Sequence, residues 1–224
     1  MKENSIAKLS LLCSLIGMVL IYFGSARKSS LTPISQIDKD FVGLKVKISG
    51  QVLDLAKHAE GHLFLKVKDS SDGVISVPIF AKINSKLEKR IELLDNIQIK
   101  GIVEEYNGEL EVLPEKAESI QVIHSTPFEI SKINKKMTGE LVKIQGTITR
   151  KKSVGKGSLL LKIKKNNGEI KVYIPSNVSN SGNLASLHEG QLIRASGLIQ
   201  TYKKELELKV EDPYNLKVVG APDD

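Results

Sequence analysis

The fold is decided by a stretch of sequence that occurs twice. Ile34–Val52 reads ISQIDKDFVGLKVKISGQV and Ile130–Ile148 reads ISKINKKMTGELVKIQGTI, with nine of the 19 positions identical. A second block repeats at the same offset of 96 residues, where GIVEEYNGELEV at Gly101–Val112 matches GLIQTYKKELEL at Gly197–Leu208. Matches of this length at a fixed offset indicate the duplication of one domain.

Each copy is predicted to consist mainly of β-strands, because apolar and polar residues alternate along it. Three alternating runs come first, and a more helical stretch follows at residues 81–94 of the first copy and 177–187 of the second. Two further strands are joined by a hairpin, with Asn107-Gly108 at the turn of the first copy and Lys203-Lys204 at that of the second. This order of elements is typical of the OB-fold, a five-stranded Greek-key barrel.

Three motifs extend this interpretation to a family. They are the V-x-I-x-G strand at Val46–Gly50, the acidic turn Asp69–Gly73 and the hairpin Gly101–Val112. Together they resemble the OB-fold nucleic-acid-binding domains of the anticodon-binding (tRNA-anti) type, in two tandem copies. The second copy departs from the pattern at its turn, Lys165–Gly168, and at its hairpin. The resemblance implies an OB-fold and specifies the ligand only weakly, because OB-folds also bind sugars, proteins and haem.

The predicted fold class is therefore all-β, with two tandem OB-fold barrels after an N-terminal transmembrane helix. The expected domains are an anchor and linker at residues 1–29, a first OB-fold at 30–125, a second OB-fold at 126–219 and a tail at 220–224.

The anchor is predicted from an apolar N-terminal run. From Ile6 to Gly24 only Lys8 is charged, and these 19 residues approach the ~20 that a helical membrane span requires. The alternative is a signal peptide cleaved after Ala26, but the run is longer than the usual core of such a peptide. We expect a single-pass membrane protein, with flanking cations that slightly favour cytoplasmic OB domains.

The charge of the chain is distributed unevenly. The net charge is +7, and residues 126–219 hold 17 basic and 8 acidic side chains, whereas residues 30–125 hold 12 basic and 15 acidic ones. Such asymmetry suggests that the second copy meets a polyanion. The alternative is that these lysines only keep the surface soluble.

The binding surface of an OB-fold is formed by strands 2 and 3 with the 1–2 and 4–5 loops. In the second copy this surface predicts a site for single-stranded nucleic acid, since cations neutralise phosphates and aromatic rings stack on bases. The predicted nucleic-acid-binding residues are Arg150, Lys151, Lys152, Lys156, Lys162, Lys164, Lys171, Tyr173, Tyr202, Lys203 and Lys204.

The equivalent surface of the first copy is less basic and more apolar, and its residues are Phe64, Lys66, Lys68 and Tyr106. It is predicted to be a weaker nucleic-acid surface, a surface for a protein partner, or the contact between the two copies. Tyr106 and Tyr202 occupy matching positions, so both also fit a structural role at a hairpin.

We expect a binding protein that is not an enzyme and that uses no cofactor or metal. No Ser/His/Asp set, Gly-rich phosphate loop or paired carboxylate recurs in both copies. His58 and His62 flank Glu60 in a predicted loop without the H-E-x-x-H spacing of a zinc helix. The first alternative is a cell-envelope OB-fold protein that binds a protein or carries a ligand. The second is a nuclease, which the lack of a clustered Asp/Glu/Arg site disfavours.

Overall fold

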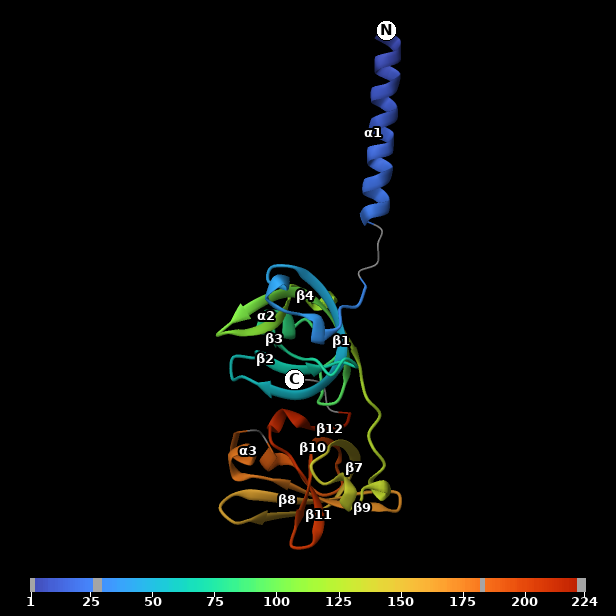
Figure 1. The fold of residues 1–224 in the computed structure, drawn as a ribbon. Helices are drawn as coiled ribbons and strands as arrows, with labels where there is room; N and C mark the ends of the chain where they lie inside the picture. Colours follow the sequence, from blue (N-terminus) through green and yellow to red (C-terminus); the bar gives the residue numbers. More distant parts are fainter. Residues whose placement is uncertain (1–2, 26–29, 182–183, 221–224) are drawn as a thin grey trace. The chain divides into compact units, whose positions relative to one another are not determined.

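The computed structural model describes residues 3–25, 30–181 and 184–220. The chain divides into two compact units, Met1–Leu31 and Thr32–Asp224. The first unit holds one helix, α1 (Glu3–Ser25). The second unit holds two six-stranded sheets, each of which curls into a barrel (Figure 1).

The predicted transmembrane anchor at residues 1–29 is wrong. No helix in the described ranges combines the length and the apolar character that crossing a membrane requires. A span needs about 20 consecutive apolar residues, and the first two turns of α1, from Glu3 to Lys8, are mostly polar. The predicted single-pass membrane localisation depended on this anchor and is therefore also wrong. Cleavage after Ala26, the alternative, and most of the predicted tail lie outside the described residues.

The first sheet consists of β1 (Lys45–Lys57), β2 (Leu63–Lys68), β3 (Val74–Ile79), β4 (Asn96–Tyr106), β5 (Glu109–Pro114) and β6 (Ile120–Ile123). The second consists of β7 (Leu141–Val154), β8 (Ser158–Lys165), β9 (Gly168–Ile174), β10 (Leu192–Tyr202), β11 (Glu205–Lys209) and β12 (Leu216–Val218). Short 3-10 helices are η1 (Ile34–Gln36), η2 (Lys39–Phe41), η3 (Ala117–Ser119), η4 (Ile130–Lys132), η5 (Lys135–Met137), η6 (Leu184–Ser186) and η7 (Pro213–Asn215).

Both sheets have the topology of a closed OB barrel. In the first, the strand order is β1-β2-β3-β5-β4-β6, and a further pairing of β1 with β4 closes the barrel. The second repeats this order with β7 to β12, and β9 pairs with β11 in parallel as β3 does with β5. The predicted all-β, OB-fold architecture is confirmed.

The helices between the third and fourth strands are shorter than predicted. The structure has α2 (Ala81–Asn84) and α3 (Ser176–Ser181) where helices over 81–94 and 177–187 were expected. After α2 the chain buries Ile91 and Leu93, two residues apart. Neither residue is helical, because Ile91 lies in an irregular segment and Leu93 in a turn, in which Leu94 has φ 68°.

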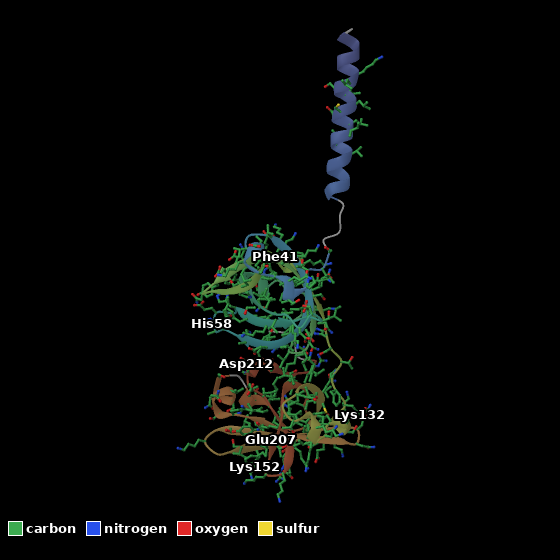
Figure 2. The ribbon with its side chains drawn as sticks, viewed as in Figure 1. Phe41, His58, Lys132, Lys152, Glu207 and Asp212 are labelled. Carbon is green, nitrogen blue, oxygen red and sulfur yellow. The ribbon has the colours of Figure 1, made fainter. Side chains whose placement is uncertain are left out.

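Each barrel has its own apolar core. Val46 and Ile48 of β1 are buried in the first core, and Val142 and Ile144 of β7 in the second. Lys152, by contrast, is exposed and projects outward (Figure 2). The alternation read from the sequence therefore specified the inward-facing residues of both first strands.

The glycine that ends each V-x-I-x-G motif allows two strands to approach closely. A Cβ atom on Gly50 would lie 2.4 Å from the Lys68 carbonyl oxygen, and one on Gly146 would lie 2.7 Å from that of Lys164. Any side chain would therefore force the first strand away from the second. This is a physical reason for glycine at both positions.

A buried group of charged residues joins the two barrels within the second unit. Lys143 of β7 is only 2% exposed, and its ammonium nitrogen lies 2.5 Å from Asp95 Oδ1 and 3.1 Å from Glu92 Oε2. Arg194 of β10 and Lys217 of β12 also contact Glu92, at 3.1 and 2.7 Å. The carboxylates come from the first barrel and the cations from the second, so neither barrel satisfies these groups alone.

Candidate nucleic-acid interface

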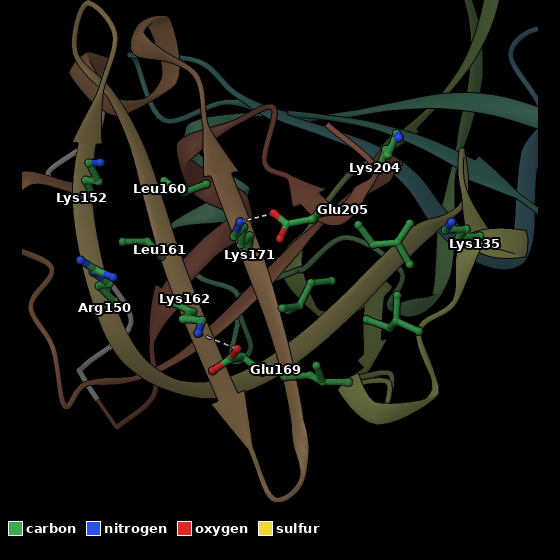
Figure 3. Close-up of a pocket in the computed structure, with 14 residues that line it drawn as sticks. Lys135, Arg150, Lys152, Leu160, Leu161, Lys162, Glu169, Lys171, Lys204 and Glu205 are labelled. Carbon is green, nitrogen blue, oxygen red and sulfur yellow. Dashed lines mark hydrogen bonds and ion pairs between the residues drawn. The ribbon is translucent and has the colours of Figure 1, made fainter. Parts of the chain in front are cut away.

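A groove of the second barrel runs over β7, β8 and β9 to the β10–β11 hairpin and has a volume of about 720 Å³. We call it the basic groove. Its cationic side chains are Lys135, Arg150, Lys152, Lys162, Lys171 and Lys204 (Figure 3). This surface is the one on which OB-folds bind oligonucleotides.

A β-bulge in β7 points two of these cations toward the groove. Up to Ile148 the even-numbered residues of β7 face the core, and unbroken alternation would also turn Arg150 and Lys152 inward. The pairing with β8 shifts between Ile148 and Arg150, so Thr149 is an extra residue. Arg150 then lies opposite Lys162, and both face outward.

Two lysines of the groove are neutralised by carboxylates. Lys162 forms a 2.7 Å ion pair with Glu169, and Lys171 forms a close ion pair with Glu205 (Figure 3). The hydrogen bond from Lys171 and its charge lower the pKa of Glu205 below its usual value. Both pairs are partly exposed to solvent, and exposed ion pairs stabilise a fold little. A phosphate therefore competes for these lysines at little cost.

The other four cations of the groove are Lys135, Arg150, Lys152 and Lys204. All are exposed, and no ion pair joins them to another side chain in the described part of the chain. A phosphate can therefore bind these four cations without first displacing a carboxylate.

The structure brings together five of the residues predicted for nucleic-acid binding: Arg150, Lys152, Lys162, Lys171 and Lys204. Lys151 faces away, because it follows the bulge on the opposite side of the strand. Its ammonium group donates to the Leu187 carbonyl at 2.7 Å. Its prediction as a groove residue does not fit this geometry.

The remaining predicted residues lie around the groove. Lys156 is exposed in the β7–β8 turn, and Lys164 is exposed further along β8. Tyr173 is half-buried, with its hydroxyl oxygen 3.3 Å from Ser158 Oγ. Tyr202 is 57% exposed at the hairpin, and the Lys203 ammonium lies 5.4 Å from its ring centroid.

Sequence reasoning missed three charged groove residues, Lys135, Glu169 and Glu205. Lys135 belongs to η5, whose position before β7 could not be read from strand alternation. Glu169 and Glu205 were missed because their roles depend on cross-strand partners. A cross-strand register, once assigned, places Glu169 beside Lys162 and is the signal that would have found it.

The β10–β11 hairpin holds its two lysines in a strained backbone conformation. Lys203 has φ 47° and Lys204 has φ 70°, in the left-handed region that favours Asn and Gly. The first barrel has Asn107 and Gly108 at the same places, at φ 51° and 83°. The second barrel thus carries two cations at the hairpin tip at the expense of backbone strain.

The first barrel has a groove of about 460 Å³ at the equivalent place, lined by Phe64, Lys66 and Tyr106 among others. We call it the acidic groove, because its other charged residues are Asp54, Glu109 and Glu111. Lys68, the fourth residue predicted for this surface, instead pairs with Asp72 at 2.8 Å.

One group of potential metal ligands occurs among the described residues. It comprises Glu92, Asp95 and His124, at the junction of the barrels. The Lys143 ammonium already contacts both carboxylates, and His124 Nδ1 lies 2.8 Å from Asp95 Oδ2. A metal ion would have to displace this buried cation, so the group does not form a metal site as it stands.

Comparisons with known structures identify similar proteins at low identity. Asparaginyl-tRNA synthetase from Pyrococcus horikoshii is 19% identical, with a TM-score of 0.37 over 43% of this chain and 23% of the synthetase. The chain therefore matches about a quarter of that enzyme's length. Tetrameric p202 HIN2 is 17% identical, with a TM-score of 0.43 over 78% of this chain and 94% of that one.

A third similar structure is the S. pombe Stn1-ten1 complex, at 17% identity and a TM-score of 0.31 over 37% of this chain and 60% of that one. No curated protein matches the sequence. A family model does match: residues 46–120 fit the tRNA anticodon family, described as an OB-fold nucleic acid binding domain. The matched residues, 46–120, lie in the first barrel.

Proposed function

We propose that this protein binds single-stranded DNA or RNA, mainly in the basic groove of the second barrel. The observation that carries the proposal is the convergence of six cationic side chains on the oligonucleotide-binding surface of an OB-fold. The proposal involves neither a chemical step nor a cofactor.

The binding mechanism is mainly electrostatic. We expect Arg150, Lys152, Lys135 and Lys204, which line the groove, to contact phosphates, and each contact releases counterions from the nucleic acid. Lys162 and Lys171 contribute once a phosphate replaces the carboxylate of Glu169 or Glu205. These exposed ion pairs also discriminate against weakly charged ligands, because only a strong anion competes with a carboxylate.

Two tyrosines near the groove provide limited stacking. Tyr202 exposes its ring at the hairpin, and Tyr173 lies on β9 two residues beyond Lys171. Bases of a single strand can stack on such rings, whereas the bases of a duplex are stacked on one another. This favours single strands over duplexes.

We further propose that the second barrel is a diverged copy of the first, so that the chain carries two tandem domains of one family. The repeat at Ile34–Val52 and Ile130–Ile148 and the shared strand order support this. Bulges at the same place in β1 and β7 support it independently. The charges of the groove residues differ between the copies, as expected if the ligands diverged while the fold was retained.

The proposal is tested by measuring the affinity of the full chain for a labelled oligothymidylate of about 15 nucleotides, the upper range for one OB-fold. Replacing Arg150, Lys162 and Lys171 by Ala should weaken binding by about tenfold or more at physiological salt. The matched control replaces Lys82, Lys86 and Lys116 of the first barrel, which are also exposed, and removes the same charge. An equal loss in both variants would contradict a role for the groove.

A further inference from the structure

The acidic groove of the first barrel has the same position in the repeat as the basic groove, but the opposite charge. Asp54, Lys66, Ser76 and Glu111 line the groove and form a row across the sheet. Glu104 on β4 continues this row beside the groove, directly opposite Glu111. The row thus has one cation and three carboxylates. The equivalent row of the second barrel has three cations and one carboxylate, namely Arg150, Lys162, Lys171, Glu207 and Gln200.

One substitution between the copies leaves a carboxylate of the acidic groove without a partner. In the second barrel Gln200 donates a hydrogen bond to Glu207 at 2.7 Å. In the first barrel Glu104 takes the place of Gln200 and lies directly opposite Glu111. Burial and the Glu104 charge both raise the pKa of Glu111 above its usual value.

This pair of like charges is unfavourable in the free protein. Carboxylates directly opposite each other on adjacent strands repel, and no cation pairs with Glu104 or Glu111 in the ranges that the structure describes. Lys66 lies opposite Asp54 on the neighbouring strand, on the far side of the groove from Glu104. A ligand that brings a positive charge to Glu104 and Glu111 would relieve the repulsion.

Three exposed aromatic rings line the same groove as Glu111. Phe64, Phe80 and Tyr106 line the groove and are 49%, 45% and 66% exposed, which is high for rings of this size. Pro78 and Ala56 extend the apolar surface between them. Aromatic faces beside carboxylates bind a guanidinium or ammonium group by cation–π contact and ion pairing together. The same combination repels phosphate.

We propose that the acidic groove binds an extended, arginine-rich peptide segment of a partner protein in which apolar and basic side chains alternate. The basic side chains pair with Glu104, Glu111 and Glu109, and the apolar ones pack on Phe64 and Phe80. Charge complementarity selects this partner over nucleic acid. This proposal is independent of nucleic-acid binding by the second barrel, so each of the two proposals can be refuted without the other.

The test uses the full chain and fluorescence anisotropy of a labelled peptide, Arg-Leu-Arg-Val-Arg-Leu-Arg. A peptide with the same arginines separated by glycine measures charge attraction alone, and it should bind more weakly. The variant Glu104→Gln/Glu111→Gln should weaken binding of the first peptide about tenfold or more, since charge-assisted hydrogen bonds are lost. Phe64→Ala should weaken binding of the first peptide more than that of the glycine peptide.

The control variant Glu115→Gln/Glu118→Gln removes the same charge from exposed positions of the first barrel outside the groove, and it should bind normally. Thermal unfolding checks the fold, and Glu104→Gln/Glu111→Gln should unfold at the same or a higher temperature because the repulsion is gone.

Equal weakening in both double variants, or equal affinity for both peptides, would overturn the proposal. Two other results would also overturn it. In the first, the chain self-associates with rising concentration and does not bind the peptide, and Glu104→Gln/Glu111→Gln abolishes the self-association. In the second, an oligonucleotide competes with the peptide for the acidic groove.

Discussion

At the residue scale, the clearest conflict between stability and charge is at the hairpin of the second barrel. Lys203 and Lys204 occupy left-handed backbone positions, at φ 47° and 70°. Residues with a Cβ atom are strained there by about 1 kcal/mol or more each. The first copy avoids the strain with Asn107 and Gly108. Retention of two lysines is consistent with a contribution to binding.

The chain itself supplies the substitution that tests this. Replacing Lys203 by Asn and Lys204 by Gly should raise the free energy of unfolding by about 1–2 kcal/mol, because a type I′ turn then has its preferred residues. The same change should weaken oligonucleotide binding severalfold, since Lys204 lines the basic groove. Urea unfolding and anisotropy titration measure the two effects. A variant that is more stable and binds as tightly as the wild type would show that the hairpin lysines have no role in binding.

Single residues also show where sequence reasoning stops. The outward orientation of Lys162 and Lys171 follows from alternation alone and could be predicted. Arg150 and Lys151 could not be told apart, because the bulge at Thr149 changes the phase of the strand. A bulge depends on the register with the neighbouring strand, which one strand's sequence does not determine.

At the element scale, β9 and β11 each place one carboxylate beside a groove lysine. Glu169 of β9 pairs with Lys162, and Glu205 of β11 pairs with Lys171. These pairs hold the lysines in place but compete with phosphate. They act as weak internal competitors of the ligand.

Removing the competitors should therefore strengthen binding. The variant Glu169→Gln/Glu205→Gln should raise oligonucleotide affinity severalfold at low salt and should change stability little, because both ion pairs are exposed. Glu129→Gln/Glu211→Gln is a matched control, because these carboxylates also form exposed ion pairs with lysines but do not line the groove. An increase of the same size in the control would mean that net charge alone sets the affinity.

The elements themselves were predicted unevenly. The strands follow from alternation, and the Asn107-Gly108 hairpin follows from its turn residues. The predicted helix over 81–94 was too long, because Ile91 and Leu93 enter the core from an irregular segment and a turn. The apolar run of α1 led to the wrong prediction of a membrane anchor, since length and apolar content must both suffice for a span.

At the scale of the whole molecule, the two barrels are joined by buried charges that the sequence did not reveal. Glu92 is 7% exposed and contacts three cations of the second barrel, Lys143, Arg194 and Lys217. Burial alone would raise the pKa of Glu92, but hydrogen bonds from Lys217 and Lys143 and the nearby charge of Arg194 lower it to about 2. Glu92 and its partners lie up to 125 positions apart in the sequence, so no local sequence pattern predicts these contacts.

The lowered pKa predicts how stability depends on pH. Because the folded pKa of about 2 lies below the ordinary value of 4.5, ionised Glu92 stabilises the fold fully above pH 4.5. That contribution is lost as the pH falls from 4.5 toward 2. Glu92→Gln should lower the free energy of unfolding by about 3–5 kcal/mol at pH 7, because buried cations lose their partner.

Denaturant unfolding across this pH range measures the effect. The difference between Glu92→Gln and the wild type should shrink below pH 4.5, whereas the exposed Glu88→Gln should differ little from the wild type at any pH. A Glu92→Gln difference that stays constant down to pH 2 would contradict the electrostatic role of Glu92.

The central claim is that a single strand is bound by localised cations in the basic groove of the second barrel. The most direct test is the salt dependence of oligothymidylate affinity, since each phosphate contact adds about 0.7 to the slope of log K against log salt concentration. Replacing Arg150, Lys162 and Lys171 by Ala should reduce the slope by about 2, and replacing Lys82, Lys86 and Lys116 should leave it unchanged. Equal slopes for the two variants would contradict the claim and show diffuse charge attraction instead.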